Sequence, residues 1–161
     1  MHQRTLHFVS LALATGLGVA YLTPFAKATL ASAVTVAFYA AIAWGDLSLN
    51  LLLIPIIAVI FFVGVAVSRR VKTDDDPDPS KVVIDEVAGQ LAAFLILAPV
   101  EWWSMLAAFV LFRVFDVLKP LGIRRLEAIP NGWGIMLDDL AAGLLAAVVL
   151  NAGILIANLV L

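Results

Sequence analysis

Long stretches of this chain carry almost no charge. Between Thr5 and Ser68 the only charged side chains are Lys27 and Asp46, and none follows Asp139. Hydrophobic residues make up 63% of the 161 residues and charged residues only 14%, whereas a soluble domain carries roughly a quarter charged residues. A globule of this size has too little interior to hide so many apolar side chains. The lipid bilayer must therefore solvate much of the surface, which predicts an integral membrane protein.

The remaining composition narrows the chemistry. There is no cysteine, which excludes thiolate nucleophiles, disulfides and thiolate metal sites. The two histidines, His2 and His7, both lie at the N-terminal end, so a histidine-based catalytic or metal site is not expected. The formal net charge of -2 is too close to neutral to indicate a nucleic-acid partner.

Apolar runs near the roughly 20 residues needed to cross a bilayer predict an all-α polytopic membrane helical bundle with about five spans. These spans are expected near residues 28–43, 48–68, 82–99, 103–119 and 136–159. Residues 6–22 contain Gly16 and Gly18 and end at Pro24; we interpret them as an N-terminal interfacial or re-entrant helix. A full span is the alternative, and a cleaved signal peptide is a rival interpretation. No change of composition divides the chain, so residues 1–161 are expected to form one domain.

Basic residues gather in two loops. Arg69, Arg70, Lys72 and Lys81 belong to the first, and Lys119, Arg124 and Arg125 to the second. Under the positive-inside rule both loops lie on the cytoplasmic side. The turns around residues 44–46 and 99–103 then face the opposite side. The acidic run 74–78 is interpreted as a solvated, turn-forming part of the first loop.

This topology brings three helix ends to one depth at the inner headgroup boundary. The charged residues that meet there are Asp85, Glu86, Arg113, Asp116, Lys119, Asp138 and Asp139. Charges at this depth cost several kcal/mol if they are unpaired and face lipid, so they should face inward and be paired or bind an ion. A membrane site of five carboxylates and two cations is therefore expected.

Spacing refines this site. Arg113, Asp116 and Lys119 are three residues apart and share one helical face, although an Arg113–Asp116 pair could equally be a structural salt bridge. Neighbouring residues on a helix diverge by about 100°, so one member of each acidic pair should point to the centre. Gly89 and Gly143 each follow an acidic pair by about a turn, which would let the helices approach closely.

Carboxylates gathered without cysteine or histidine suit a hard, oxygen-loving cation such as Mg²⁺. Cationic side chains beside such an ion suit phosphate recognition. A small membrane transporter or channel for a divalent cation or a proton is the alternative. Its ionisable groups should, however, lie near the bilayer midplane.

Three segments resemble motifs of the phosphatidylglycerophosphatase A family, in matching order and spacing, and the resemblance runs from about residue 12 onward. They are Ile84-Asp85-Glu86-Val87-Ala88-Gly89-Gln90, Phe112-Arg113-Val114-Phe115-Asp116-Val117-Leu118-Lys119-Pro120 and residues 132–143, Gly-Trp-Gly-Ile-Met-Leu-Asp-Asp-Leu-Ala-Ala-Gly. The resemblance implies a Mg²⁺-dependent, multi-pass phosphatase of the bacterial inner membrane, with its active site facing the cytoplasm. It would remove the terminal phosphate of the phospholipid phosphatidylglycerophosphate to give phosphatidylglycerol.

We hypothesise metal-assisted hydrolysis of a phosphate monoester, with a role for each site residue. A subset of Asp85, Glu86, Asp138 and Asp139 would hold Mg²⁺. Arg113 would clamp phosphate oxygens, and Lys119 would supply a second cation as charge develops. Asp116 would accept a proton, orient Arg113 or bind metal.

One segment departs from the family pattern. Where the family carries a Pro-Gly-Thr-x-Gly-Ser run, this chain has Lys27-Ala28-Thr29-Leu30-Ala31-Ser32. Thr29 and Ser32 remain and are expected to contact substrate, and Lys27 could replace the lost backbone contacts as a cation. Membrane lipids are the expected partners, and a homo-oligomer is compatible with the sequence.

Overall fold

The computed structural model describes residues 2–23, 25–43, 48–71, 81–96 and 101–160. Every regular element in these ranges is helical, as expected for an all-α fold. The elements are α1 (His2–Ala14), η1 (Val19–Tyr21), α2 (Lys27–Ala43), α3 (Ser48–Val71), α4 (Ile84–Ala93), α5 (Trp102–Leu118), η2 (Pro120–Ala128) and α6 (Trp133–Val160), where η1 and η2 are 3₁₀ helices. The predicted turn at 44–46, residues 99–100 of the turn predicted at 99–103 and the acidic run 74–78 lie outside the described residues.

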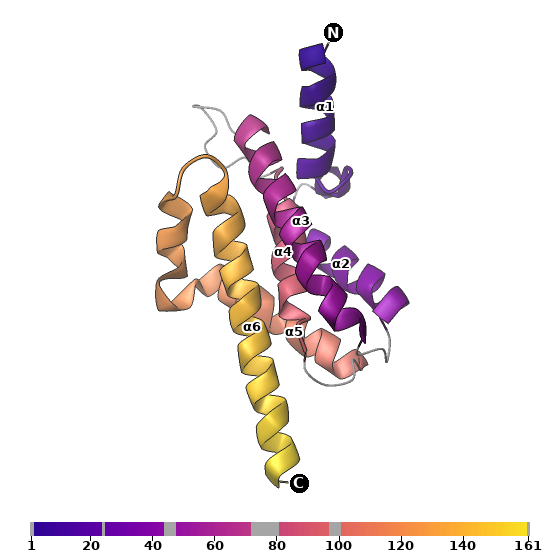
Figure 1. Cartoon of the computed structure of the whole chain (residues 1–161), viewed down its shortest axis with the longest axis vertical. Coiled ribbons are helices and arrows are strands. Elements are labelled where there is room, and N and C mark those ends of the chain that lie inside the picture. The colour runs from indigo at the N-terminus through magenta and orange to yellow at the C-terminus, as the bar shows by residue number, and fades with distance from the viewer. Residues whose placement is uncertain (1, 24, 44–47, 72–80, 97–100, 161) are drawn as a thin grey trace.

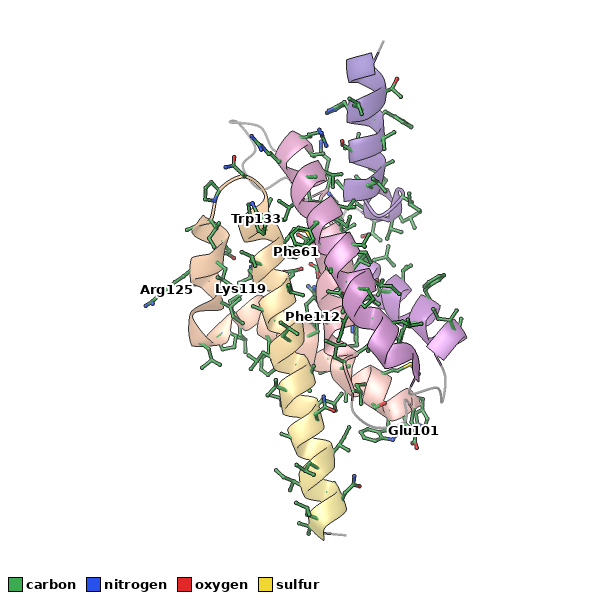
Figure 2. The ribbon with its side chains drawn as sticks, in the orientation of Figure 1. Phe61, Glu101, Phe112, Lys119, Arg125 and Trp133 are labelled. Carbon is green, nitrogen blue, oxygen red and sulfur yellow. The ribbon has the colours of Figure 1, made fainter. Side chains whose placement is uncertain are left out.

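The short helix α4 is the core of the bundle. It packs against α2, α3, α5 and α6 (Figure 1). Eight of its ten residues are buried, including Glu86 and Gln90. From α5, Phe112 is fully buried in the centre of the molecule, whereas Arg125 on η2 points away from it (Figure 2). Glu86 and Gln90 of α4 are therefore enclosed by protein.

The predicted span at 82–99 is wrong in its length. A ten-residue helix rises about 15 Å, half of the roughly 30 Å hydrocarbon core, and the chain leaves the helix after Ala93. The Asn151 side-chain amide of α6 donates a hydrogen bond to Leu95 O (2.8 Å), so a carbonyl released at this helix end stays paired. This segment is apolar because protein surrounds it, not because lipid does.

Two helices in the described ranges are long and apolar enough to cross a membrane, namely α3 over Leu52–Val71 and α6. They correspond to the spans expected at 48–68 and 136–159. The segments expected at 28–43 and 103–119 form α2 and α5, each of 17 residues and so about 25 Å long. Five full spans are therefore not confirmed. The outer faces still expose large apolar side chains, such as Phe38, Phe62 and Leu155, as membrane-embedded helices do.

Residues 6–22 do not form one helix, so they do not cross a membrane as a single continuous helix. Helix α1 ends at Ala14, and the chain then turns through Gly16, Leu17 and Gly18, which all have positive φ. Glycine adopts this left-handed backbone without steric cost. The Val83 amide donates to Ala14 O (2.8 Å), so this turn holds the residue that precedes α4.

The close approach predicted from the two glycines is confirmed where α4 meets α6. A Cβ atom built on Gly143 would lie 2.0 Å from Gly89 O, and one built on Gly89 would lie 2.7 Å from Asp139 O. Any larger residue would push the two helices apart. Because Glu86 and Asp139 lie within about a turn of these glycines, the contact sets how close the two acidic helix segments lie.

Candidate functional site

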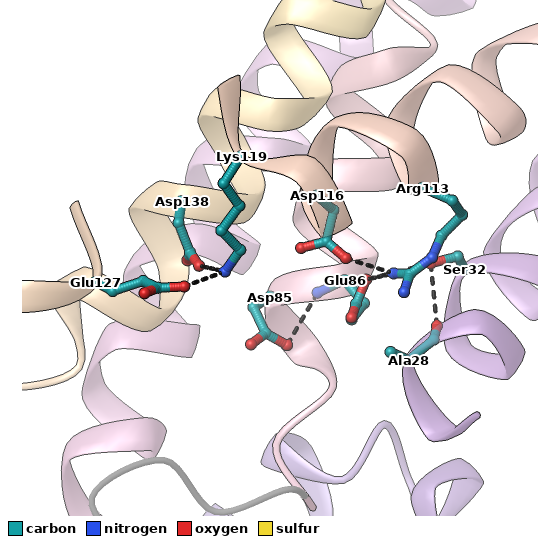
Figure 3. Close-up of polar contacts among 9 residues, drawn as sticks. All are labelled: Ala28, Ser32, Asp85, Glu86, Arg113, Asp116, Lys119, Glu127 and Asp138. Carbon is teal, nitrogen blue, oxygen red and sulfur yellow. Dashed lines mark hydrogen bonds and ion pairs between the residues drawn. The ribbon is translucent and has the colours of Figure 1, made fainter. Parts of the chain in front are cut away.

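Charged side chains from α4, α5, η2 and α6 meet in one cluster (Figure 3). Glu86 lies in the first turn of α4, Arg113 and Asp116 in the last turns of α5, and Asp138 and Asp139 in the second turn of α6. Glu86, Asp116, Asp138 and Asp139 are all at least 92% buried. The three helix ends expected from the topology do come together.

Arg113 joins two of these elements. Its Nη1 atom forms an ion pair with Glu86 Oε2 and a second with Asp116 Oδ2 at 3.1 Å. The Arg113–Asp116 contact is the three-residue pair expected from spacing. The additional contact with Glu86 shows that the guanidinium bridges α4 and α5 and belongs to the cluster. Both ion pairs use Nη1, and a guanidinium carries five N–H donors in a planar fork.

Lys119 forms a second cationic centre. It ends α5 in the left-handed conformation (φ 46°), and Pro120 follows, so its side chain turns back across the site. Its Nζ lies 2.5 Å from Asp138 Oδ2 and 2.5 Å from Glu127 Oε1. Burial of the ammonium by itself lowers the pKa of Lys119, but the hydrogen bonds to Asp138 and Glu127 outweigh burial and raise that pKa above its ordinary value. The lysine is therefore charged at neutral pH.

Three carboxylates form a compact acidic cluster, defined here as Glu86, Asp116 and Asp139. One oxygen from each lies within 4.8 Å of the other two. Burial raises the pKa of Glu86 in spite of the nearby Arg113 guanidinium, and Asp139 Oδ2 is buried without a hydrogen-bond partner in the described structure. With Arg113 included, the ionised cluster carries a formal charge of -2. Its oxygen donors, orphaned oxygen and charge fit a divalent hard cation.

The expected metal ligands separate into two groups. Glu86 and Asp139 lie in the acidic cluster, so one member of each acidic pair points to its centre. Asp138 turns to Lys119 instead, and Asp85 Oδ1 accepts a hydrogen bond from the Glu86 backbone amide (2.9 Å). Asp116 takes the third place in the cluster.

The two hydroxyl residues expected to contact substrate differ in position. Ser32 on α2 is fully buried, and its Oγ lies 3.4 Å from Glu86 Oε2 and 3.1 Å from Ala28 O. Thr29, one turn earlier, lies on the exposed side of α2. Ser32 therefore borders the acidic cluster, whereas no hydrogen bond joins the exposed Thr29 to it in the described structure.

Sequence reasoning missed two residues. Glu127 reaches Lys119 because η2 reverses the chain, with Leu121 and Gly122 at positive φ. In the sequence, the dipeptide Leu121-Gly122 was the only indication that the chain reverses here. Gln90, one turn after Glu86, is fully buried with neither amide atom hydrogen-bonded in the described structure. A glutamine inside an apolar helix was its signal.

Comparisons with known proteins identify the family. A family model described as phosphatidylglycerophosphatase A matches residues 12–154. A curated protein of Bacteroides thetaiotaomicron, named putative phosphatidylinositol-3-phosphatase, is 33% identical over 147 residues, covering 84% of this chain and 87% of that protein. Phosphatidylglycerophosphatase A of Haemophilus influenzae is 37% identical over 97 residues, 59% of this chain and 60% of the relative. The Escherichia coli protein of that name is 36% identical over 74 residues, 45% and 43% of the two chains.

No solved structure matches this chain. The family model nevertheless spans all three charged motifs and the helices that carry them, from the end of α1 into the last turns of α6. On that match, together with a site whose charged groups suit a phosphate ester, the chain belongs to the phosphatidylglycerophosphatase A family of phosphatases.

Proposed function

We propose that this protein hydrolyses the terminal phosphate of phosphatidylglycerophosphate, giving phosphatidylglycerol and inorganic phosphate, with Mg²⁺ as cofactor. The observation that carries the proposal is one juxtaposition: a buried three-carboxylate cluster lies beside two cationic side chains within the helical bundle. The names of the Haemophilus and Escherichia relatives point to the same substrate.

Glu86, Asp116 and Asp139 would hold the cation. A divalent cation there would neutralise the charge of the phosphate and would lower the pKa of a water molecule. Arg113 orients the phosphate through the guanidinium N–H groups that its two ion pairs do not use. The planar guanidinium can donate to two phosphate oxygens at once. Lys119, held charged by Asp138 and Glu127, faces the same site and stabilises the negative charge that develops as the ester bond breaks.

The site would face the cytoplasm. Arg69 and Arg70 lie in the last turn of α3, and Arg124 and Arg125 lie on η2. Both segments lie near the end of the bundle at which α6 begins (Figure 1). A cluster of exposed cations at the site end of the molecule favours a cytoplasmic orientation in the inner membrane.

The transport alternative has less support. Asp138 and Asp139 lie in the second turn of a 28-residue helix, so the carboxylates gather at one end of α6 rather than at its middle. Transport sites lie near the bilayer midplane.

A second substrate is favoured by the name of the Bacteroides relative, a putative phosphatidylinositol-3-phosphatase. Phosphatidylinositol 3-phosphate is also a phosphomonoester on a lipid headgroup, so the same cluster and cations could act on it. It therefore belongs in the first assay.

The test is phosphate release by detergent-purified protein from phosphatidylglycerophosphate, phosphatidylinositol 3-phosphate and phosphatidic acid, with Mg²⁺ and with a chelator. We expect Mg²⁺-dependent release that is fastest with phosphatidylglycerophosphate. Mg²⁺ should also raise the thermal unfolding midpoint of the wild type but not that of Asp139→Asn. No release from folded, lipid-supplemented protein would refute the proposed function, and equal release with chelator would refute the metal.

A further inference from the structure

One face of α5 is polar at one end and apolar along the rest. Trp102, Leu106, Phe109, Arg113 and Asp116 follow one another at spacings of four, three, four and three residues, so they form a single stripe. The last two belong to the site. The other three are apolar, and Trp102 and Leu106 are 64% and 53% exposed.

On α2, Val36 follows Ser32 by one helical turn on the same side of the helix. Ala33 lies next to this side, and both Ala33 and Val36 are apolar. Between α2 and α5 lies an open groove of about 200 Å³, lined by Ala33, Val36, Trp102, Met105, Leu106 and Phe109. Its lining begins within one helical turn of both Ser32 and Arg113.

We propose that this α2–α5 groove binds an acyl chain of the lipid substrate, with the phosphate held at Arg113; the proposal rests on the phosphatase function above. The groove is continuous with the site. The α2 and α5 surfaces that carry site residues near one end line an apolar groove along the rest of their length. From Arg113 to Trp102 the helix rises about 16 Å, about half of a roughly 30 Å hydrocarbon core and so the depth of one leaflet. The stripe thus matches a lipid in both polarity and length.

A larger apolar groove of about 480 Å³ lies between α2 and α3 and is the natural competitor. It is lined by the opposite face of α2, including Val34 and Phe38, and by Ile84, Val87 and Leu91 of α4. None of the charged site residues lines it.

Neighbouring residues of α2 provide a matched test. Ala33 lines the α2–α5 groove and Val34 the α2–α3 groove, and both are exposed. Tryptophan at either position fills its groove with the same side chain on the same helix. Leu106→Trp fills the α2–α5 groove from the α5 side, away from Ser32.

The measurement is kcat/KM for dipalmitoyl and dihexanoyl phosphatidylglycerophosphate in mixed micelles. Ala33→Trp and Leu106→Trp should each lower kcat/KM for the dipalmitoyl substrate by about tenfold or more, because a displaced chain misplaces the phosphate. The dihexanoyl substrate should be nearly unaffected, which also shows that the variants are folded. Val34→Trp should match the wild type with both substrates.

Wild-type chain-length selectivity in both groove variants would overturn the proposal, and so would selective loss in Val34→Trp alone. Equal loss with both substrates in the groove variants would overturn it too, because damage to the site would then explain the result. Absence of turnover by the wild type with either substrate would instead refute the phosphatase function on which the proposal rests.

Discussion

The contact between Gly89 and Gly143 predicts that one added methyl group in α6 disables the site. In Gly143→Ala the new Cβ would lie 2.0 Å from Gly89 O, whereas ordinary contact begins near 3.4 Å. The two helices must therefore separate or slide by roughly 1 Å. Asp139 lies one turn before Gly143, and Glu86 three residues before Gly89, so the shift is passed to the acidic cluster.

Overpacking of this kind lowers the free energy of unfolding by about 1–3 kcal/mol. The higher helix propensity of alanine offsets up to about 1 kcal/mol of that loss. A misplacement of about 1 Å at a reacting centre lowers activity by about 10²-fold. We therefore expect Gly143→Ala to remain folded but to lose about two orders of magnitude in kcat/KM.

The matched control is Gly153→Ala on the same helix, where a Cβ meets no heavy atom within 4 Å. It should keep wild-type kcat/KM and be as stable as the wild type or slightly more so. Both variants are compared by phosphate release and by thermal unfolding in the same detergent. Wild-type turnover in Gly143→Ala would refute the idea that this helix contact sets the spacing of the carboxylates.

Four further substitutions test other parts of the site and fold. Arg113→Lys should lower kcat/KM by about 10²-fold, because an ammonium cannot reproduce a planar fork; unchanged kinetics would mean that charge alone suffices. Asp138→Asn removes the buried charged partner of Lys119 and should lower the free energy of unfolding, measured with denaturant, by about 1–3 kcal/mol. Glu127→Gln removes a half-exposed partner of the same lysine and should lower that free energy by less than about 1 kcal/mol. The reverse order would contradict the burial argument. Leu121→Gly should raise the thermal unfolding midpoint. Leu121 is 88% exposed and has φ 55°, a left-handed backbone that costs a residue with a side chain about 1–2 kcal/mol. A lower midpoint would show that the leucine side chain stabilises the turn.

Much of the site could be predicted from the spacing of charges along the chain. Asp85-Glu86, Arg113 to Lys119 and Asp138-Asp139 each lie where an apolar run begins or ends, and the cost of lipid-facing charge brings such positions together. A glycine follows each acidic pair by about one turn, and this spacing also predicted the tight contact between Gly89 and Gly143. Only residues without a side chain allow helix backbones to approach so closely.

The tertiary structure decided which charges form the cluster. Adjacent carboxylates diverge by about 100°, so the rotation of each packed helix selects Glu86 and Asp139 and turns Asp138 to Lys119. Asp116 joins the cluster where α5 packs against α4, with Arg113 paired to both Glu86 and Asp116, and Glu127 reaches Lys119 because η2 folds back.

The tertiary structure also decided that α4 is a core helix. Lipid tails are as apolar as leucine, so an apolar segment has the same composition whether lipid or protein surrounds it. Composition therefore determined that this chain enters a membrane. Only the packing of α2, α3, α5 and α6 around Ile84–Ala93 determined which of its apolar segments is enclosed by protein.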